Sequence, residues 1–258
     1  MYPSCLSEDQ FLILKPLLES DSVSNAGRPK KYPCHLMVNG ILYTLKTGCQ
    51  WRMLPNDFPV WQTVYSFFRK LKLSGLWGTI MDALRSLVRI SEEKSPNPTA
   101  GIIDARTNKA AIKYGNVDIG YDAGKKIKGR KQHIIVDTLG LPLVVQVHAA
   151  DIQDRDGAKL LFDQITKKEP TLKVIFADGG YAGKLVDWVN ETFPWKLEIV
   201  KRSELHKFVI LRKRWIVERT FSWLVDHRRI ARDYERNYKT SESMIQIAMI
   251  SLMLRRLA

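Results

Sequence analysis

The chain has 258 residues, 45% of them hydrophobic and 10% aromatic, which is enough to bury a sizeable core in one or two domains. Forty-one Lys and Arg against 27 Asp and Glu give a net charge of +14, so nucleic acid is the leading class of partner. An odd number of cysteines without a CxxC pair argues against disulfide and zinc–cysteine frameworks, and the absence of an apolar leader or a spanning apolar stretch argues against secretion and a membrane. We therefore expect a globular protein of the cytoplasm.

The first predicted helix begins near Ser7. Ser7 and Gln10 have the three-residue spacing of a capping box, and the apolar run FLIL follows them. Pro16 lacks a backbone donor, so we expect it to kink or end this helix.

Further helices are predicted in the rest of the N-terminal region. Met37, Ile41 and Leu45 share one stripe of a helix that Gly48 would end. The segments VWQTVYSFFRKLKLSG and LWGTIMDALRSLVR repeat the same periodicity. We predict a small all-α domain with helix-turn-helix-like topology over residues 1–92.

The pattern changes after SEEKSPNPTA, which contains two prolines and no apolar periodicity. Three short runs rich in Ile and Val follow, GIID, QHIIVDT and LPLVVQVHA, as expected for successive strands. Helical segments then alternate with the strands KVIFAD and LEIVK, and two helices close the chain. The order βββαβαβα with a terminal helix predicts an α/β domain with a mixed (α+β) sheet over residues 93–258.

Aspartates end three of the predicted strands. Asp104 follows GII, Asp137 follows HIIV, and Asp178 follows KVIFA just before two glycines. Carboxylates held close on neighbouring strands repel each other unless a divalent cation neutralises them, and such oxygen ligands favour Mg²⁺ or Mn²⁺. The alternative is that a strand-terminal aspartate caps a turn. Spacing and composition do not separate these three candidates.

Glu218 lies in RWIVERTFSWL, beside the apolar stripe of Val217, Phe221 and Leu224. At the edge of that face its carboxylate can lean into a site. The alternative is an i, i+4 ion pair with Arg214, worth only about 0.5 kcal/mol on an exposed helix. The residues alone leave both readings open.

Two basic runs, GKKIKGRK and HRRIARDYER, are candidates for contact with a DNA backbone. A charge run is also typical of a solvated surface, so these runs predict phosphate contact rather than base recognition. The residues assigned to DNA contact in them are Lys125, Lys126, Lys128, Arg130, Lys131, Arg228 and Arg229.

Several blocks resemble one family of enzymes. IIDARTNK, DAGKKIKGRKQHIIVDTLGLPLVVQVHAADIQDRDGA, FADGGYAG and RWIVERTFSWLVDHRRIARDYE are similar to the insertion-sequence transposases of the IS-five family, within the IS-four superfamily. LSEDQFLILKPLL, GRPKKY and LKTGCQWRMLPNDFPVWQTVYSFFRK resemble the helical domain that precedes catalysis in that family. The resemblance covers nearly the whole chain, in the family's order.

This resemblance implies an RNase H-like catalytic domain with a DDE triad, which maps onto Asp104, Asp178 and Glu218. It gives Asp137 a turn role. The triad would act as ligands of two Mg²⁺ ions per active site, with Mn²⁺ as an alternative, rather than as acid or base. The implied reaction is metal-dependent strand cleavage and strand transfer in DNA transposition, without a covalent enzyme intermediate.

The implied partner is double-stranded DNA, as terminal inverted repeats and as target. A homodimer is the simplest device for holding two ends together in a synaptic complex. The protein would work in the bacterial cytoplasm, associated with the nucleoid when bound to DNA.

The superfamily's tyrosine–arginine–glutamate–lysine motif matches in part. Arg214 and Glu218 stand at its arginine and glutamate positions, so Arg214 joins the implied DNA contacts, whereas Leu211 and Val225 replace the tyrosine and lysine. Two alternatives stay open. One is another RNase H-like nuclease that cleaves without strand transfer, and the other is a catalytically decayed DNA-binding protein.

Overall fold

The computed structural model describes residues 2–19, 31–111, 118–200 and 211–258, with only the backbone described for residues 211–214. The chain forms two compact units. The first comprises Met1–Glu93, Leu224–Ala231 and Ser243–Ala258, and the second comprises Lys94–Trp223 and Arg232–Glu242. The first break falls at the predicted linker. The last helical segments, however, pack with the N-terminal helices and not with the unit predicted over residues 93–258.

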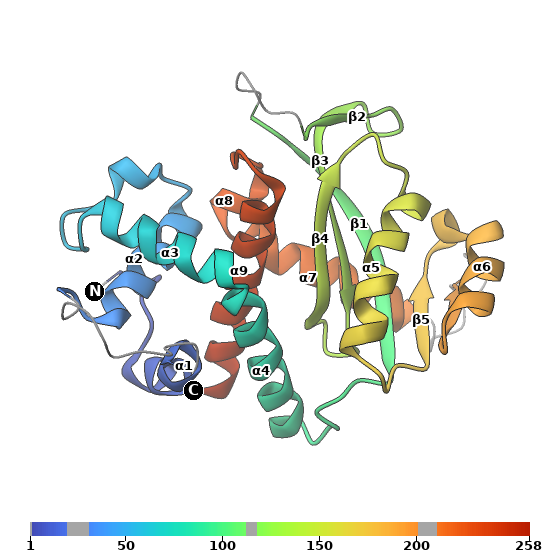
Figure 1. The fold of residues 1–258 in the computed structure, drawn as a ribbon, viewed down its shortest axis with the longest axis horizontal. Coiled ribbons are helices and arrows are strands. Elements are labelled where there is room, and N and C mark those ends of the chain that lie inside the picture. The colour runs from blue at the N-terminus through green and yellow to red at the C-terminus, as the bar shows by residue number, and fades with distance from the viewer. Residues whose placement is uncertain (1, 20–30, 112–117, 201–210) are drawn as a thin grey trace. The chain divides into compact units, whose positions relative to one another are not determined.

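The first unit is helical (Figure 1). Its core is formed by fully buried aliphatic and aromatic side chains, among them Leu14, Ile41, Phe68 and Leu84. The helical character predicted for the N-terminal region is therefore confirmed. The elements are α1 (Glu8–Glu19), α2 (Cys34–Thr47), the 3₁₀ turn η1 (Trp51–Met53), α3 (Trp61–Ser74), α4 (Leu76–Ser91), α8 (Arg228–Ala231) and the larger part of α9 (Tyr238–Leu257).

Two helix ends follow directly from local sequence. The capping box is present, because the amide of Ser7 donates to Gln10 Oε1 and the amide of Gln10 donates to Ser7 Oγ, both at 3.2 Å. Gly48 ends α2 as predicted, with a φ of 73° and its amide donating to the carbonyl of Thr44.

Of the two predicted effects of Pro16, a kink or the end of the helix, the second is wrong, since α1 continues to Glu19. The carbonyl that loses its helical partner belongs to Leu12, whose side chain is 62% exposed and so lies on the solvent face. Leu14 and Leu18 are buried and hold the turns on either side of the proline.

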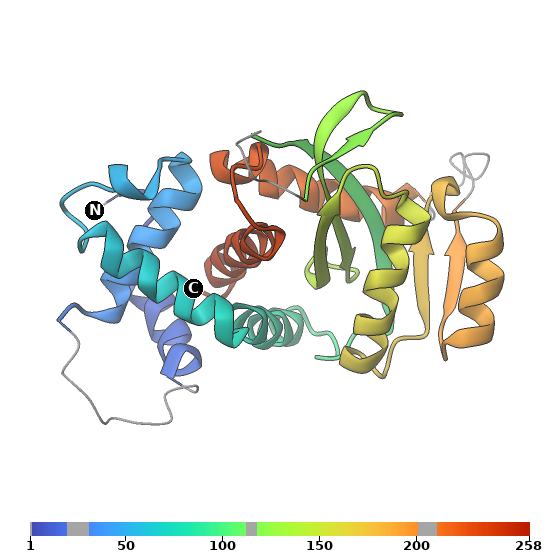
Figure 2. The ribbon, with the colours of Figure 1, turned by 45° about the horizontal axis from the view of Figure 1, so that its top comes forward.

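The second unit is a six-stranded mixed sheet with helices on both faces, which confirms the predicted α/β class (Figures 1 and 2). Its strands are β1 (Ala100–Lys109), β2 (Gly120–Asp122), β3 (Ile127–Val136), β4 (Pro142–Ala149), β5 (Val174–Ala177) and β6 (Lys196–Ile199). Its helical elements are α5 (Asp154–Lys168), the 3₁₀ turn η2 (Gly179–Tyr181), α6 (Lys184–Thr192) and α7 (Leu211–Val225), the last up to Trp223.

Strand β3 is central to the sheet. It pairs antiparallel with β1 along one edge and with β2 and β4 along the other, while β5 and β6 continue parallel to β1. All five predicted strands are present, and β2 is an addition. This strand is only three residues long, and Thr107 Oγ1 fastens it by donating to Asp122 Oδ2 at 2.6 Å.

The two faces of the sheet have different roles. Ile103 and Ile135 belong to a core that α5 covers with Leu161 and Phe162. Because side chains alternate along a strand, Asp104 points to the opposite face. Figures 1 and 2 show α7 on that opposite side of the sheet from α5.

Candidate active site

Asp104 lies within β1 and is partly buried. The prediction that this residue ends a strand is wrong, because β1 continues to Lys109 through its pairing with β3. Its Oδ1 accepts a hydrogen bond of 2.7 Å from the amide of Ala105. Burial raises the pKa of Asp104 to about 6, and the negative charges of Asp178 and Glu218 add to that rise. The Ala105 amide and the Lys125 ammonium act in the opposite direction. Asp178 and Glu218 therefore lie close enough to Asp104 for their charges to act on its ionisation.

Asp178 reaches this site because β1 and β5 are parallel neighbours. Ile102 lies opposite Phe176, so Asp104 and Asp178, each two residues further on, emerge on the same face and at the same edge. Asp178 Oδ1 also accepts from the amide of Gly180 at 2.8 Å, which caps η2. A side chain at Gly179 would meet no atom within 4 Å, so the backbone beside this acid borders open space.

Glu218 comes from α7. Val217, Phe221 and Leu224 are buried and fix the apolar side of the helix, as the sequence predicted, while Glu218 is exposed. Its charge raises the pKa of Asp104, although Asp178 contributes more. The alternative ion pair with Arg214 lies outside the described side chains, as does the predicted DNA contact of Arg214.

The donor set of the site fits a hard divalent cation. Carboxylate oxygens are the ligands that Mg²⁺ and Mn²⁺ prefer. A cation would offset the cost of burying the Asp104 carboxylate and the smaller repulsion from Asp178 and Glu218. Among the described side chains, no three His, Cys, Asp or Glu groups lie close enough to hold one ion together. The acids thus form a cluster of interacting charges rather than a closed ligand cage.

Asp137, the third of the candidate aspartates, follows the end of β3 and builds a turn. Its side chain is fully buried, and Oδ1 accepts from the amides of Leu139 at 2.9 Å and Leu141 at 2.8 Å. The turn role that the resemblance gives this residue is confirmed. The same turn contacts α7, where Arg219 Nη2 donates a hydrogen bond of 3.0 Å to the carbonyl of Leu139.

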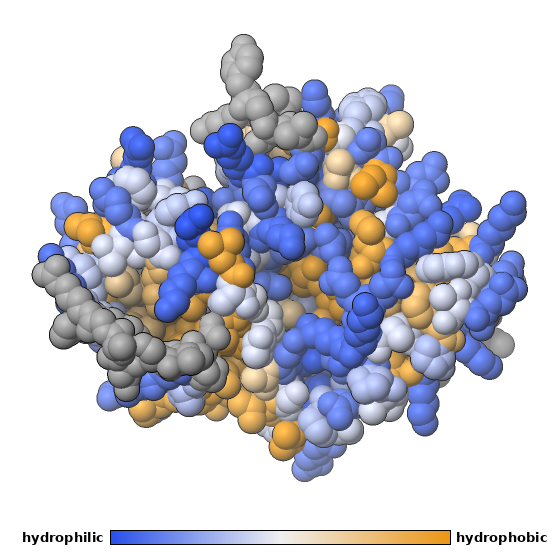
Figure 3. Space-filling model, in the orientation of Figure 1, coloured by the Kyte–Doolittle hydropathy of each residue, from blue (hydrophilic) through white to orange (hydrophobic). Residues whose placement is uncertain are grey.

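The hairpin formed by β2 and β3 carries the exposed part of the first basic run. Lys125, Lys126 and Lys128 are exposed, and Lys126 adopts a φ of 56° at the bend. Figure 3 shows mostly hydrophilic side chains over this hairpin. Lys125 is close enough to Asp104 to lower its pKa, so the positive charge of the hairpin reaches the acidic site.

Arg130 and Lys131 are corrections to the predicted DNA contacts. Arg130 is 1% exposed, and its guanidinium donates to Asp233 Oδ2 at 3.3 Å and to the carbonyl of Glu235 at 2.8 Å. Lys131 is 7% exposed and pairs with Asp154 Oδ1 at 2.8 Å. Both cations stabilise the fold of the second unit and are not available to a phosphate.

The second basic run is divided in the same way. Arg228 is exposed. Arg229 is 8% exposed, donates to the carbonyl of Cys49 at 2.8 Å and lies over the Trp51 ring at 5.2 Å. Arg229 is therefore removed from the predicted DNA contacts, because its charge is used within the helical unit.

The sequence analysis missed a buried polar network on the α5 face. Tyr181, His133 and His148 follow one another at hydrogen-bond distance, with His133 Nε2 at 2.8 Å from Tyr181 Oη and His133 Nδ1 at 3.2 Å from His148 Nε2. Tyr181 and His133 are 1% and 0% exposed. The position of His133 within the apolar run of a predicted strand was the feature of the sequence that could have indicated this network.

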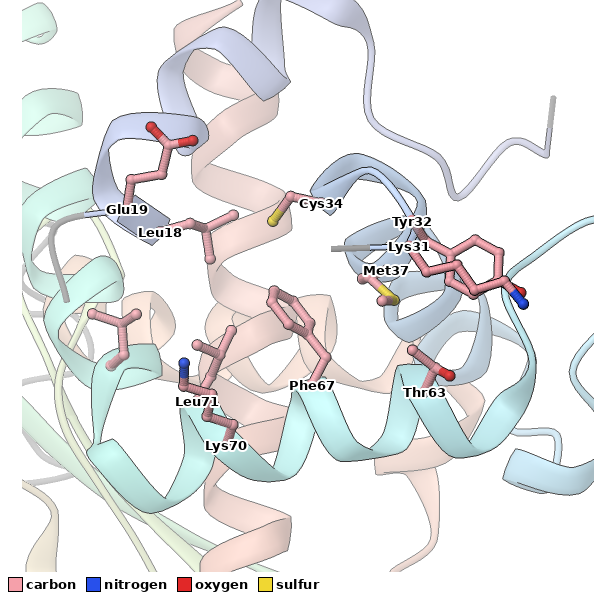
Figure 4. A pocket seen from close by; sticks show the side chains of 11 residues that line it. Leu18, Glu19, Lys31, Tyr32, Cys34, Met37, Thr63, Phe67, Lys70 and Leu71 are labelled. Carbon is pink, nitrogen blue, oxygen red and sulfur yellow. The ribbon is translucent and has the colours of Figure 1, made fainter. Parts of the chain in front are cut away.

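A separate pocket of about 300 Å³ lies in the helical unit, among α1, α2 and α3 (Figure 4). Leu18, Met37 and Phe67 form part of its apolar wall, and Lys70 lies at its edge. None of its lining residues belongs to the acidic site.

Comparison with known proteins identifies the class of this fold and site. Residues 95–254 match the family described as "Transposase DDE domain". This match covers more than half of the chain, so the chain belongs to the DDE transposases. The matched domain is RNase H-like, in agreement with the mixed sheet of the second unit.

The particular type follows from two further matches. Residues 6–81 match the family described as "Putative transposase of IS4/5 family". The "Putative transposase for insertion sequence element IS402" of Burkholderia cepacia is 30% identical over 115 residues, which cover 42% of this chain and 54% of that relative. The chain thus belongs to the IS4/IS5 type and spans about half the length of this relative. No solved structure matches it.

Among the described residues, no helix is both long enough and apolar enough to cross a membrane.

Proposed function

We propose that this chain catalyses DNA transposition, cutting DNA at the terminal inverted repeats of an insertion sequence and joining the cut ends to target DNA. The observation that carries the proposal is the match of residues 95–254 to the transposase DDE domain, together with the register of β1 and β5, in which Asp104 and Asp178 lie on the same face of the sheet. We assign the carboxylates from β1, from the end of β5 and from α7 to one site, and the contribution of Asp178 and Glu218 to the raised pKa of Asp104 supports this assignment.

Asp104, Asp178 and Glu218 would hold the divalent cations, two per active site, with Mg²⁺ as the expected ion and Mn²⁺ as a substitute. Bound cations of this kind activate water or a 3′ hydroxyl and stabilise the leaving oxygen. The acids remain ligands throughout, so no covalent enzyme intermediate forms. The open space beside Gly179 leaves room for a phosphodiester next to Asp178.

Lys125, Lys126 and Lys128 are proposed to contact the DNA backbone, because they are exposed on one hairpin and Lys125 acts on the charge of Asp104. Arg228 is a further candidate, since it is exposed. Arg214 stays a proposal that rests on the resemblance alone. A homodimer acting on DNA in the bacterial cytoplasm completes the proposal.

The test is cleavage and joining of a duplex that carries the cognate terminal repeat, with Mg²⁺, Mn²⁺ or EDTA. The variants are Asp104→Asn, Asp178→Asn and Glu218→Gln, which remove charge with little change of shape. Asp137→Asn is the matched control, because it changes an aspartate that also ends a strand but builds a turn.

We expect metal-dependent products from the wild type and from Asp137→Asn, and none from the other three variants. Cleavage that survives in all three would overturn the site. Cleavage without joining would indicate a nuclease, and DNA binding without cleavage would indicate a decayed transposase.

A further inference from the structure

The acids of the site stand on one face of the sheet, and the network of Tyr181, His133 and His148 lies on the other. Strand β3 connects the two faces. Ile134 lies opposite Asp104, and the next residue along, His133, lies opposite Ala105. His133 is thus attached through the backbone ladder to the strand that carries the first acid.

The turn that carries the second acid is fastened to the same histidine. Asp178 begins η2 and Tyr181 ends it, with the amide of Tyr181 donating to the carbonyl of Asp178 at 3.2 Å. The phenol oxygen of Tyr181 lies 2.8 Å from His133 Nε2. From α5, Arg155 Nε donates to the carbonyl of Gly180 at 3.1 Å, so the turn is held from two sides.

The contact between His148 and the carbonyl of Ala149 determines which group donates in each hydrogen bond of the network. His148 Nδ1 lies 2.9 Å from the carbonyl of Ala149, which only accepts, so this nitrogen carries the proton. In a neutral His148 ring, Nε2 then carries no proton and accepts a hydrogen bond from His133 Nδ1. In a neutral His133 ring, Nε2 consequently carries no proton and accepts from the Tyr181 phenol. Tyr181 is therefore a donor to a histidine of fixed tautomer.

The protonation states agree with this assignment. Burial lowers the pKa of His133 well below its usual value, and it also lowers that of His148. Burial raises the pKa of Tyr181 well above its usual value, with Asp104 contributing next. At neutral pH both imidazoles are neutral and the phenol keeps its proton.

We propose that Tyr181 and His133 are positioning residues that fix Asp178 relative to Asp104 for joint binding of a divalent cation. The phenol-to-imidazole bond joins the turn after β5 to β3, which is itself paired with β1. Loss of this bond removes the side-chain link between the turn and β3, so the separation of the two carboxylates varies more. This inference rests on the proposed metal-dependent function.

The experiment measures Mn²⁺ binding to the full chain by electron paramagnetic resonance, beside the thermal unfolding of each variant. Tyr181→Phe removes the hydroxyl and keeps the buried ring. Thr166→Val is the matched control, because it removes another hydrogen bond of the same core, the one from Trp195 Nε1 to Thr166 Oγ1 at 3.0 Å. Asp104→Asn reports whether the measured Mn²⁺ occupies the proposed site.

We expect Tyr181→Phe to bind Mn²⁺ about ten-fold more weakly than the wild type, in the range found for outer-shell partners of metal ligands. Thr166→Val should bind as the wild type does. Equal affinity of Tyr181→Phe and wild type, or an equal loss in Thr166→Val, overturns the positioning role. Wild-type binding that Asp104→Asn does not weaken overturns the proposed metal site, and the inference with it.

Discussion

Thr220 Oγ1 donates a hydrogen bond of 2.7 Å to the carbonyl of Gly140, and this bond fastens α7 to the turn that follows β3. Gly140 has a φ of 82°, and a side chain there would fall 2.8 Å from Thr220 Oγ1. The turn is built by Asp137, and the helix carries Glu218 two residues before Thr220. The aspartate that is not part of the triad therefore supports the placement of its third acid.

Thr220→Val should destabilise the second unit by about 1–2 kcal/mol, because Thr220 is fully buried and the carbonyl of Gly140 loses its donor. Thr220→Ser keeps the hydroxyl and should retain most of the stability. Urea unfolding of both variants checks this. Equal losses for valine and serine would show that the methyl group, and not the hydrogen bond, stabilises the turn.

Asp137→Ala should cost about 2 kcal/mol, since the part-buried amide of Leu139 and the buried amide of Leu141 both lose their acceptor. Asp137→Asn should cost much less, because one carboxylate oxygen accepts both bonds and an amide oxygen can replace it. Thermal unfolding separates the two variants. A large loss for asparagine would mean that the charge of Asp137 is needed for folding.

Gly157→Ala should destabilise the protein, although alanine is the better helix former by about 1 kcal/mol. A methyl group at Gly157 would fall 2.5 Å from His148 Nε2 and 2.8 Å from His133 Nδ1. Such crowding costs about 1–3 kcal/mol and would displace the two imidazoles. The measurement is the free energy of unfolding, and a gain in stability would contradict the observed packing.

The free energy of unfolding should fall as the pH rises, because Glu242 loses its proton in a buried position. Burial raises its pKa from 4.5 to about 7, against the amide of Val147 and the charge of Lys239. The folded state therefore holds this proton more firmly than the unfolded chain does. Its contribution is full below about pH 4.5 and is lost as the pH rises through about 7.

Chemical unfolding at pH 5 and pH 8 tests this dependence. Glu242→Gln should reduce the difference between the two pH values by roughly 2 kcal/mol. Part of the difference should remain, because the pKa of Asp104 is also raised, to about 6. An unchanged difference would show that Glu242 ionises normally in the folded protein.

Lys125→Ala and Lys128→Ala should each weaken binding of a DNA duplex and lower the salt dependence of binding by about one counterion. The control is Lys159→Ala, which removes a lysine with a 51% exposed side chain from α5, away from the hairpin. Binding isotherms at several salt concentrations give the result. Equal effects at all three positions would indicate a diffuse positive field and not a hairpin contact.

Helices and strands with long apolar patterns could be predicted from the sequence. Features that depend on contacts between residues far apart in the chain could not. Asp178 follows an apolar run, so its place at the end of β5 could be predicted, whereas β1 continues past Asp104 to Lys109. The burial of Arg130 could not be predicted from the sequence, because its charge pairs with Asp233, a residue far away along the chain. Strand β2 is too short for alternation to reveal it.

The residues alone left three candidate aspartates, and only the resemblance to a family chose between them. Two acids of the candidate site sit at the same edge because parallel strands share a register, whereas Asp137 has the same local pattern and differs only in the turn it closes. Residues of the network such as His133 were missed, since an isolated polar residue in an apolar strand does not show which partner it meets.

Residues 224–231 and 243–258 belong to the helical unit, and this has a consequence for folding during synthesis. A ribosome releases Met1–Glu93 long before the buried residues of α9, such as Met244 and Ile247, have been synthesised. The N-terminal helices must therefore wait for the last segment of the chain to complete their core. Expression of residues 1–93 alone should give a fragment with exposed apolar surface and a tendency to aggregate.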